Sequence, residues 1–134
     1  MLYPKNTAPR LDPALFQSPT SEYRGTPFWA WNGKLSRADL ERQISVLQTM
    51  GMGGFHIHVR TGLDIPYLSE EYMDHIHFCM EEARRRGMLV WLYDEDRWPS
   101  GTAGGSVTRD RPEYARKTLL MTTTPYAPDR KSVV

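Results

Sequence analysis

Three strand-like segments alternate with two helical segments in this chain, at intervals of about 30 residues. The strand-like segments are PFWAW (27–31), GGFHIHVR (53–60) and MLVWLY (88–93). Strands that are joined through a helix are normally parallel and connected by right-handed crossovers. The pattern therefore predicts an α/β fold with three parallel strands, built from repeated βα units.

The first helix has clear start and stop signals. Ser36 is placed to cap it, and Gly51 is placed to end it. Leu40, Ile44 and Leu47 follow at i, i+4 and i+7, which predicts one apolar stripe facing the core.

The second helix is expected between Ser69, its cap, and Gly87, its stop. Its predicted apolar stripe consists of Met73, Ile76, Met80 and Ala83. The basic run 84–86 lies in the last turn, where cations complement the helix dipole and satisfy free carbonyls.

The residue patterns of the second and third strand segments predict which faces of the sheet are buried. In 53–60, Phe55, Ile57 and Val59 share one face, and the two histidines share the other with Arg60. The continuous apolar run 88–93 is typical of a strand buried on both faces. A further strand is expected at 118–124 because of its threonine content.

Length and composition limit the other possibilities. The 134 residues suit one domain, and a net charge of +1 offers no electrostatic basis for binding nucleic acid or an anionic membrane. Cys79 is the single cysteine, so no internal disulfide forms, and an inert thiol is expected. The chain as given has no signal-like or membrane-spanning run, which predicts a cytoplasmic location; export of a longer parent protein stays open.

Three ranges are predicted: an irregular lead-in (1–26), the βα units (27–128) and a non-native tail (129–134). The tail reads DRKSVV, which matches in full the translation of a common sequencing-adapter stretch. A closed (β/α)₈ barrel needs about 250 residues. We therefore expect that the natural gene continues beyond the codons of this sequence, and that the 134 residues form an incomplete TIM barrel.

Polar and aromatic residues gather just after each strand, in WNG, HIHVRTGL and YDEDRWPSG, whereas the opposite loops TMGMGG and RRRGM hold ordinary turn residues. In parallel βα folds the functional site lies at these carboxyl ends. Asp94 and Asp96 alternate with Glu95, and paired carboxylates suit glycoside hydrolysis. The same groups also suit sugar hydroxyls, a cation, or ion pairs with Arg97 or Arg60.

Two other residue types bear on the chemistry. Trp31 and Trp98 lie at strand ends and suit stacking on a sugar, whereas Trp29 and Trp91 lie within strands and suit the core. His56 and His58 have the spacing of a metal-dependent barrel hydrolase, but two histidines do not complete a zinc site.

Three blocks resemble glycoside hydrolase family 106, the bacterial α-L-rhamnosidases and their relatives. They are EYRGTPFWAWNGKLSRADLERQI, MGMGGFHIHVRTGLDIPYLSEEYM and GMLVWLYDEDRWPSGTAGG. The resemblance covers about 22–114. It implies the N-terminal part of a (β/α)₈ catalytic barrel in a large multidomain enzyme that cleaves terminal α-L-rhamnosyl or similar bonds in plant or bacterial glycans, with inversion.

The resemblance also implies roles for particular residues. The catalytic pair of glutamates is expected C-terminal to this chain, so the fragment alone should be inactive and poorly stable. A calcium ion near the site of the whole enzyme is implied; the residues themselves predict no cofactor and no metal site. The implied carbohydrate-binding residues are Trp31, Asn32, His58, Arg60, Asp94, Glu95, Asp96 and Trp98.

Two alternatives stay open. One is a metal-dependent TIM-barrel hydrolase that uses His56 and His58. The other is a small non-catalytic carbohydrate-binding domain, for which cooperative unfolding of the isolated chain with stabilisation by sugar is expected.

Overall fold

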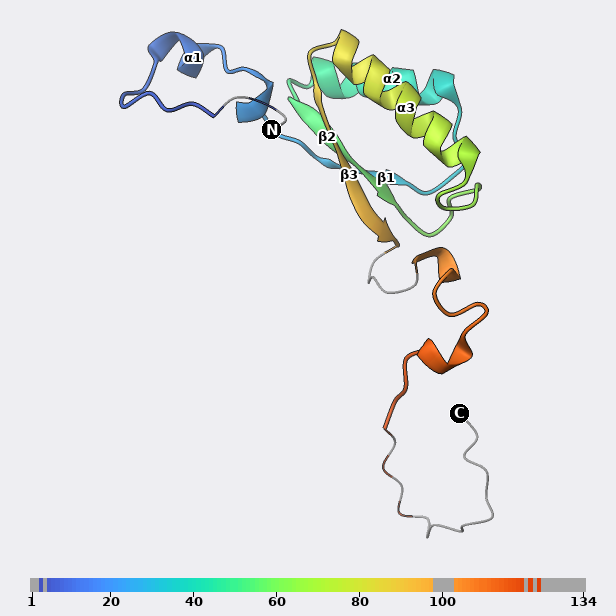
Figure 1. The fold of residues 1–134 in the computed structure, drawn as a ribbon. Coiled ribbons are helices and arrows are strands. Elements are labelled where there is room, and N and C mark those ends of the chain that lie inside the picture. Colours follow the sequence, from blue (N-terminus) through green and yellow to red (C-terminus); the bar gives the residue numbers. More distant parts are fainter. Residues whose placement is uncertain (1–2, 4, 98–102, 120, 122, 124–134) are drawn as a thin grey trace.

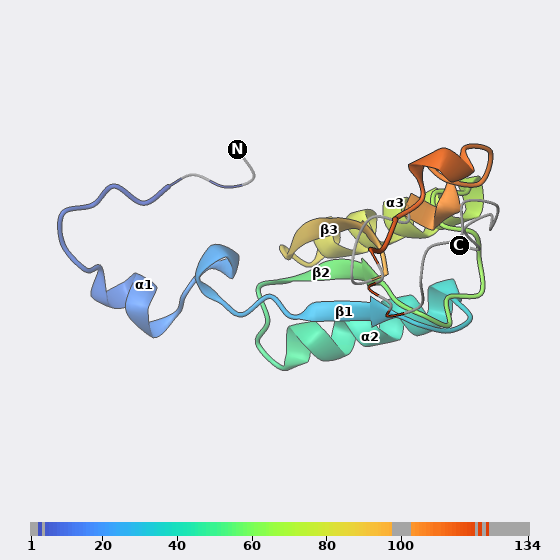
Figure 2. The same cartoon turned by 90° about the horizontal axis from the view of Figure 1, so that it is seen from below.

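The computed structural model describes residues 3, 5–97, 103–119, 121 and 123. Its centre is a parallel sheet in the order β1-β2-β3, made of Phe28–Trp31, Gly54–Val59 and Leu89–Asp96. Helix α2 (Arg37–Thr49) joins β1 to β2, and α3 (Glu70–Arg85) joins β2 to β3. Both helices lie on the same face of the sheet (Figures 1 and 2). The α/β class and the three parallel strands are confirmed.

The predicted caps form. The hydroxyl oxygen of Ser36 accepts from the backbone N–H of Asp39, and that of Ser69 accepts from Tyr72. Gly51 and Gly87 follow the two helices with φ of 82° and 65°, values that glycine adopts without strain.

The core lies between the sheet and the two helices. The strands contribute Trp29, Trp31, Phe55, Ile57 and Val59, and α2 contributes Leu40 and Ile44. Successive residues of a strand point to opposite faces, so each of these strand residues is two positions from the next on its own strand. The predicted stripe of α2 is confirmed, with Leu47 partly buried beside it.

The buried stripe of α3 differs from the one predicted. The fully buried side chains are Tyr72, Cys79 and Ala83, with Ile76 beside them, whereas Met80 is 48% exposed. The two stripes overlap and have similar helical spacing, so hydropathy alone does not separate them. Packing of α3 against α2 and β3 selects the stripe that holds the cysteine.

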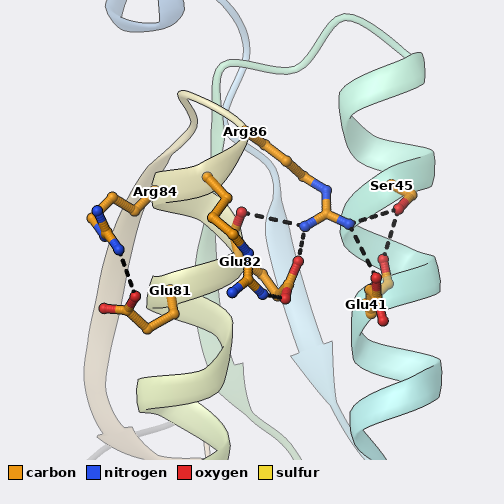
Figure 3. A network of polar contacts seen from close by, with 7 residues as sticks. Glu41, Ser45, Glu81, Glu82, Arg84 and Arg86 are labelled. Carbon is orange, nitrogen blue, oxygen red and sulfur yellow. Dashed lines mark hydrogen bonds and ion pairs between the residues drawn. The ribbon is translucent and has the colours of Figure 1, made fainter.

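A polar network links the carboxyl end of α3 to α2 (Figure 3). Arg86 forms an ion pair with Glu82, donates to the Glu82 carbonyl at 3.3 Å, and reaches Ser45 and Glu41 of α2 at 3.2 and 3.5 Å. Glu82, 5% exposed in its side chain, also pairs with Arg85. The basic run therefore satisfies a last-turn carbonyl, as predicted, and also fastens the two helices together.

Other parts differ from expectation. The lead-in contains α1 (Pro13–Gln17), capped by the carboxylate of Asp12, and a 3-10 turn η1 (Ser21–Tyr23). Strand β3 is only partly buried, and Leu92 is 49% exposed, because no helix follows β3 to cover it in the described residues. Two further 3-10 turns, η2 (Ala103–Gly105) and η3 (Pro112–Tyr114), follow.

The strand predicted at 118–124 is wrong for the residues that the structure describes there, since 118, 119, 121 and 123 lie outside any strand. Threonine content favours a strand only where a neighbouring strand offers pairing. Within the described part of the chain, no helix is long and apolar enough to span a membrane.

Candidate functional site

The loop after β2 packs closely on the turn after β1. The backbone N–H of Arg60 donates to Trp31, and that of Asp64 donates to Gly33, at 3.0 and 3.4 Å. Gly62 has a φ of 105°, and a Cβ there would lie 2.5 Å from the carbonyl oxygen of Asn32. Only glycine fits this approach without strain. The segments that follow β1 and β2 therefore lie in close contact, and we call the edge formed by the carboxyl ends of the strands the rim.

The face of the sheet opposite the helices carries a cluster of rings. Phe28 contacts His56, His58 and Tyr93, with ring centroids 5.3–5.4 Å apart. His56 stacks on Trp91 at 4.9 Å, and its Nδ1 lies 3.1 Å from the Thr26 carbonyl oxygen. Alternation along the strands places these rings away from the core. The cluster gives the uncovered face an aromatic surface that leads towards the rim.

His58 lies at the end of this cluster that is nearest the rim. It is 8% exposed, and its Nε2 has no hydrogen-bond partner in the described residues. Desolvation by burial lowers the pKa of His58, the charge of Arg60 lowers it further, and Glu95 acts in the opposite direction. Depending on its tautomer, the free ring nitrogen of a neutral imidazole can donate a hydrogen bond to a bound molecule or accept one from it.

The end of β3 departs from regular pairing with β2. Ile57 pairs with Leu92, but Val59 pairs with Asp96, so β3 carries additional residues at this point. Such irregularities re-aim side chains and are frequent beside active sites. Here Oε2 of Glu95 is buried and lacks a partner in the described residues.

Tyr93 and Tyr67 also belong to this end of the sheet. Desolvation raises the pKa of Tyr93, and the negative charges of Glu95 and Asp94 raise it further. The Tyr67 hydroxyl donates to the backbone carbonyl of Asp94 at 3.2 Å. Sequence reasoning missed Tyr67; an aromatic residue in a loop that follows a strand was the signal that could have revealed it.

The acidic residues of β3 have distinct surroundings. Asp96 is 3% exposed and accepts from Nε and Nη2 of Arg97 at 3.1 and 2.6 Å, whereas Asp94 is exposed. The regular alternation expected for 94–96 is therefore not kept. Of the roles considered for these carboxylates, the structure gives Asp96 an ion pair with Arg97.

Two hollows adjoin the rim. One, of about 360 Å³, lies between the loop after β2 and the segments around Arg97 and Arg109. The other, of about 460 Å³, lies on the open face of the sheet, beside Phe28, His58 and Tyr93. Arg60 lines both hollows. Arg109 was missed by sequence reasoning, because it lies well beyond the strand end.

The predicted binding residues separate into groups. Arg60 and Glu95 lie close enough to His58 to affect its pKa, and Arg60 and Asp96 line the same hollow. Asn32 is exposed on its turn. Trp31 is 2% exposed and packs edge-on against Trp29 and Tyr72, so it belongs to the core instead of the rim. Trp98 lies outside the described residues, as does the range 129–134.

Metal ligands are not assembled in the described part of the chain. It contains no group of three or more histidine, cysteine, aspartate or glutamate side chains that could hold an ion. The Asp96 carboxylate is engaged by Arg97, and His56 is directed to a backbone carbonyl. These residues therefore fit neither a calcium site nor a zinc site on their own.

Comparison with known proteins gives one distant similarity. No protein-family profile matches the chain. The chain is 27% identical over 110 residues to the protein named "Putative beta-glucuronidase" from Formosa agariphila. The similarity covers 78% of this chain but only 9% of that protein's length. The chain thus spans about a tenth of the length of the curated relative that it matches.

Proposed function

We propose that this chain is the N-terminal part of a glycoside hydrolase, and that the carboxyl ends of its strands form part of the carbohydrate-binding site. The observation that carries the proposal is that two buried polar atoms, His58 Nε2 and Glu95 Oε2, have no hydrogen-bond partner in the described residues. They belong to the carboxyl-terminal parts of the neighbouring parallel strands β2 and β3. Buried polar atoms are normally hydrogen-bonded, so a bound polyhydroxylated molecule is a natural partner. The distant relative carries the name of a glycosidase, which supports the same class.

The proposed architecture is a (β/α)₈ barrel of which these are the first three strands. Both helices cover one face of the sheet, as in the outer layer of such a barrel. The ring cluster of Phe28, His58 and Tyr93 would then face the barrel interior, and Arg60, Asp94 and Glu95 would line its functional rim.

The proposed reaction is hydrolysis of a terminal α-L-rhamnosyl or similar bond with inversion. An inverting enzyme uses one carboxylic acid to protonate the leaving oxygen and one carboxylate to activate water, about 6.5–9.5 Å apart. We assign that pair to glutamates C-terminal to this chain. The assignment rests on the resemblance of the PFWAWNG and YDEDRWPSG blocks to the rhamnosidase family. The role of His58, Arg60, Asp94 and Glu95 is to hold the sugar by hydrogen bonds.

The test begins with the source DNA. The reading frame is sequenced across the codons for 124–134, and the longest product is assayed with aryl α-L-rhamnosides and other aryl glycosides. We expect hydrolysis, reduced at least tenfold in His58→Gln and in Glu95→Gln, and unchanged in the control Glu113→Gln. The contrary result is a genuine stop codon after Val134 together with a 134-residue chain that binds sugar but does not hydrolyse it. That result would support a carbohydrate-binding domain and contradict the enzyme hypothesis.

A further inference from the structure

The hollow of about 360 Å³ is distinct in composition from the open face of the sheet. Its walls combine the apolar side chains of Leu63 and Ile65 with the ring of Tyr67. Its volume lies at the small end of the range for small-molecule sites, about 300–1,000 Å³. A single sugar unit is the size of ligand that such a space admits.

The charge of this hollow is strongly positive. Three arginines, Arg60, Arg97 and Arg109, line it together with one carboxylate, Asp96. Arg97 already holds that carboxylate through two hydrogen bonds. Arg109 donates to the Gly104 carbonyl at 3.2 Å, which directs its side chain along the wall. Among the described residues that line the hollow, no other carboxylate balances the charges of Arg60 and Arg109.

The backbone around the hollow is also unusual. The non-glycine residues with positive φ in the described part of the chain are Leu68, Arg97 and Ala103, at 61°, 65° and 43°. All three line this hollow. Such conformations cost of order 1–3 kcal/mol each and concentrate at ligand-binding sites. The strain here shapes the walls that carry the arginines.

From these features we infer that the hollow binds the anionic group of an acidic sugar, a carboxylate or a sulfate ester, with Arg60 and Arg109 as its ligands. Arginine presents a planar fork of donors that matches both groups, and such charge-assisted bonds are about twice as strong as neutral ones. The inference rests on the proposed function, and it adds the substrate class: a glycan that contains acidic residues. Arg60 also borders the open-face hollow, so the acidic unit would lie next to the sugar bound there.

The test uses the 134-residue chain and nuclear magnetic resonance titration of the arginine Nε–H signals. The ligands are methyl β-D-glucuronide, its neutral counterpart methyl β-D-glucoside, and glucose 6-sulfate. We expect at least one acidic ligand to bind tenfold or more tightly than the glucoside, with weaker binding as sodium chloride is raised. Arg60→Gln and Arg109→Gln should each weaken that binding about tenfold, whereas Arg10→Gln, in the exposed lead-in, should not.

The outcomes separate the inference from the proposed function. Preference for the glucuronide assigns a carboxylate, and preference for the 6-sulfate assigns a sulfate ester; both support the inference. Equal binding of acidic and neutral ligands, or no binding of any acidic ligand, overturns it. Hydrolysis of neutral glycosides by the longest product is measured separately, so the glycosidase proposal survives or fails on its own result. Thermal unfolding of each variant confirms that a loss of binding is not a loss of folding.

Discussion

The ring of His58 lies edge-on to the ring of Tyr93, with 4.4 Å between the two centroids. This contact occurs on the face of the sheet that no described helix covers, yet His58 is 8% exposed. The aromatic neighbours therefore remove water from the imidazole and lower its pKa. The neutral imidazole keeps one nitrogen as a donor and the other as an acceptor.

Stability should fall as pH is lowered from about 6.5. Burial holds the pKa of folded His58 below its ordinary value of 6.5. Below this pH the unfolded chain therefore binds a proton that the folded chain does not, so the free energy of unfolding decreases as the pH falls. We expect urea denaturation between pH 5 and 7.5 to give a shallower pH slope for His58→Phe. His77→Phe, on the exposed side of α3, should keep the original slope; equal slopes in both variants would contradict the prediction.

Neutralising Glu82 should destabilise the chain far more than neutralising its neighbour Glu81. The Glu82 side chain is 5% exposed and pairs with Arg85 and Arg86, whereas Glu81 and its partner Arg84 are 57% and 74% exposed. Removing one partner of a buried pair costs about 3 kcal/mol, and exposed pairs contribute about 0.2–1 kcal/mol. Chemical denaturation of Glu82→Gln and Glu81→Gln measures the difference. Similar losses in the two variants would show that the network is not a buried one.

Removing the hydroxyl of Tyr72 should not weaken the fold. That hydroxyl is buried and has no hydrogen-bond partner in the described residues, whereas the Tyr67 hydroxyl donates to Asp94. An unsatisfied buried group costs about 1–3 kcal/mol. We expect Tyr72→Phe to leave the free energy of unfolding unchanged or to raise it by about 1 kcal/mol. Tyr67→Phe should lower it by about 1 kcal/mol; the reverse order would indicate a hidden partner for Tyr72.

Alanine should be tolerated at Gly33 but not at Gly62. A Cβ at Gly62 would lie 2.5 Å from the Asn32 carbonyl oxygen, and the alanine would have to keep the backbone φ of 105°. A Cβ at Gly33 would have no atom within 4 Å. Gly62→Ala should lower the melting temperature by several degrees, since a loss of about 1–3 kcal/mol is expected for such backbone strain. Differential scanning calorimetry of both variants provides the comparison, with Gly33→Ala expected to stay close to the parent chain.

Cys79 should react with thiol reagents only when the chain unfolds. It is fully buried in α3, and burial raises its pKa to about 12, so little thiolate forms near neutral pH. Iodoacetamide at pH 8 should leave the native chain unmodified and should alkylate it quantitatively in urea. Rapid modification without urea would mean that α3 does not stay packed on the sheet.

The elements were predictable because each one carries strong local signals. The caps at Ser36 and Ser69 and the stops at Gly51 and Gly87 bound the two long helices, and period-two alternation marked β2. The stripe of α3 was not predictable, because Tyr72 and Met73 both begin helical repeats and only tertiary packing distinguishes them. The partial burial of β3 was also missed, since continuous hydrophobicity does not reveal which neighbours are present.

The site was partly predictable for a similar reason. The rule that function lies at the carboxyl ends of parallel strands predicted a site at His58, Arg60 and Glu95; the structure places these residues at the strand ends, and their binding role stays a proposal. Trp31 was misplaced, although its two-residue spacing from Trp29 already put both on the core face. The hollow formed by Tyr67 and Arg109 depends on loop conformations with positive φ, which hydrophobic periodicity does not encode.

The core also has a consequence for synthesis of the protein. Every residue of the buried cluster lies between Trp29 and Met88, and Val90 of β3 is the last described residue that packs against it. Translation delivers these residues in the chain order β1, α2, β2, α3. A nascent chain on the ribosome therefore holds the buried cluster and the residues packed against it once Val90 has left the exit tunnel, so packing can begin while translation continues.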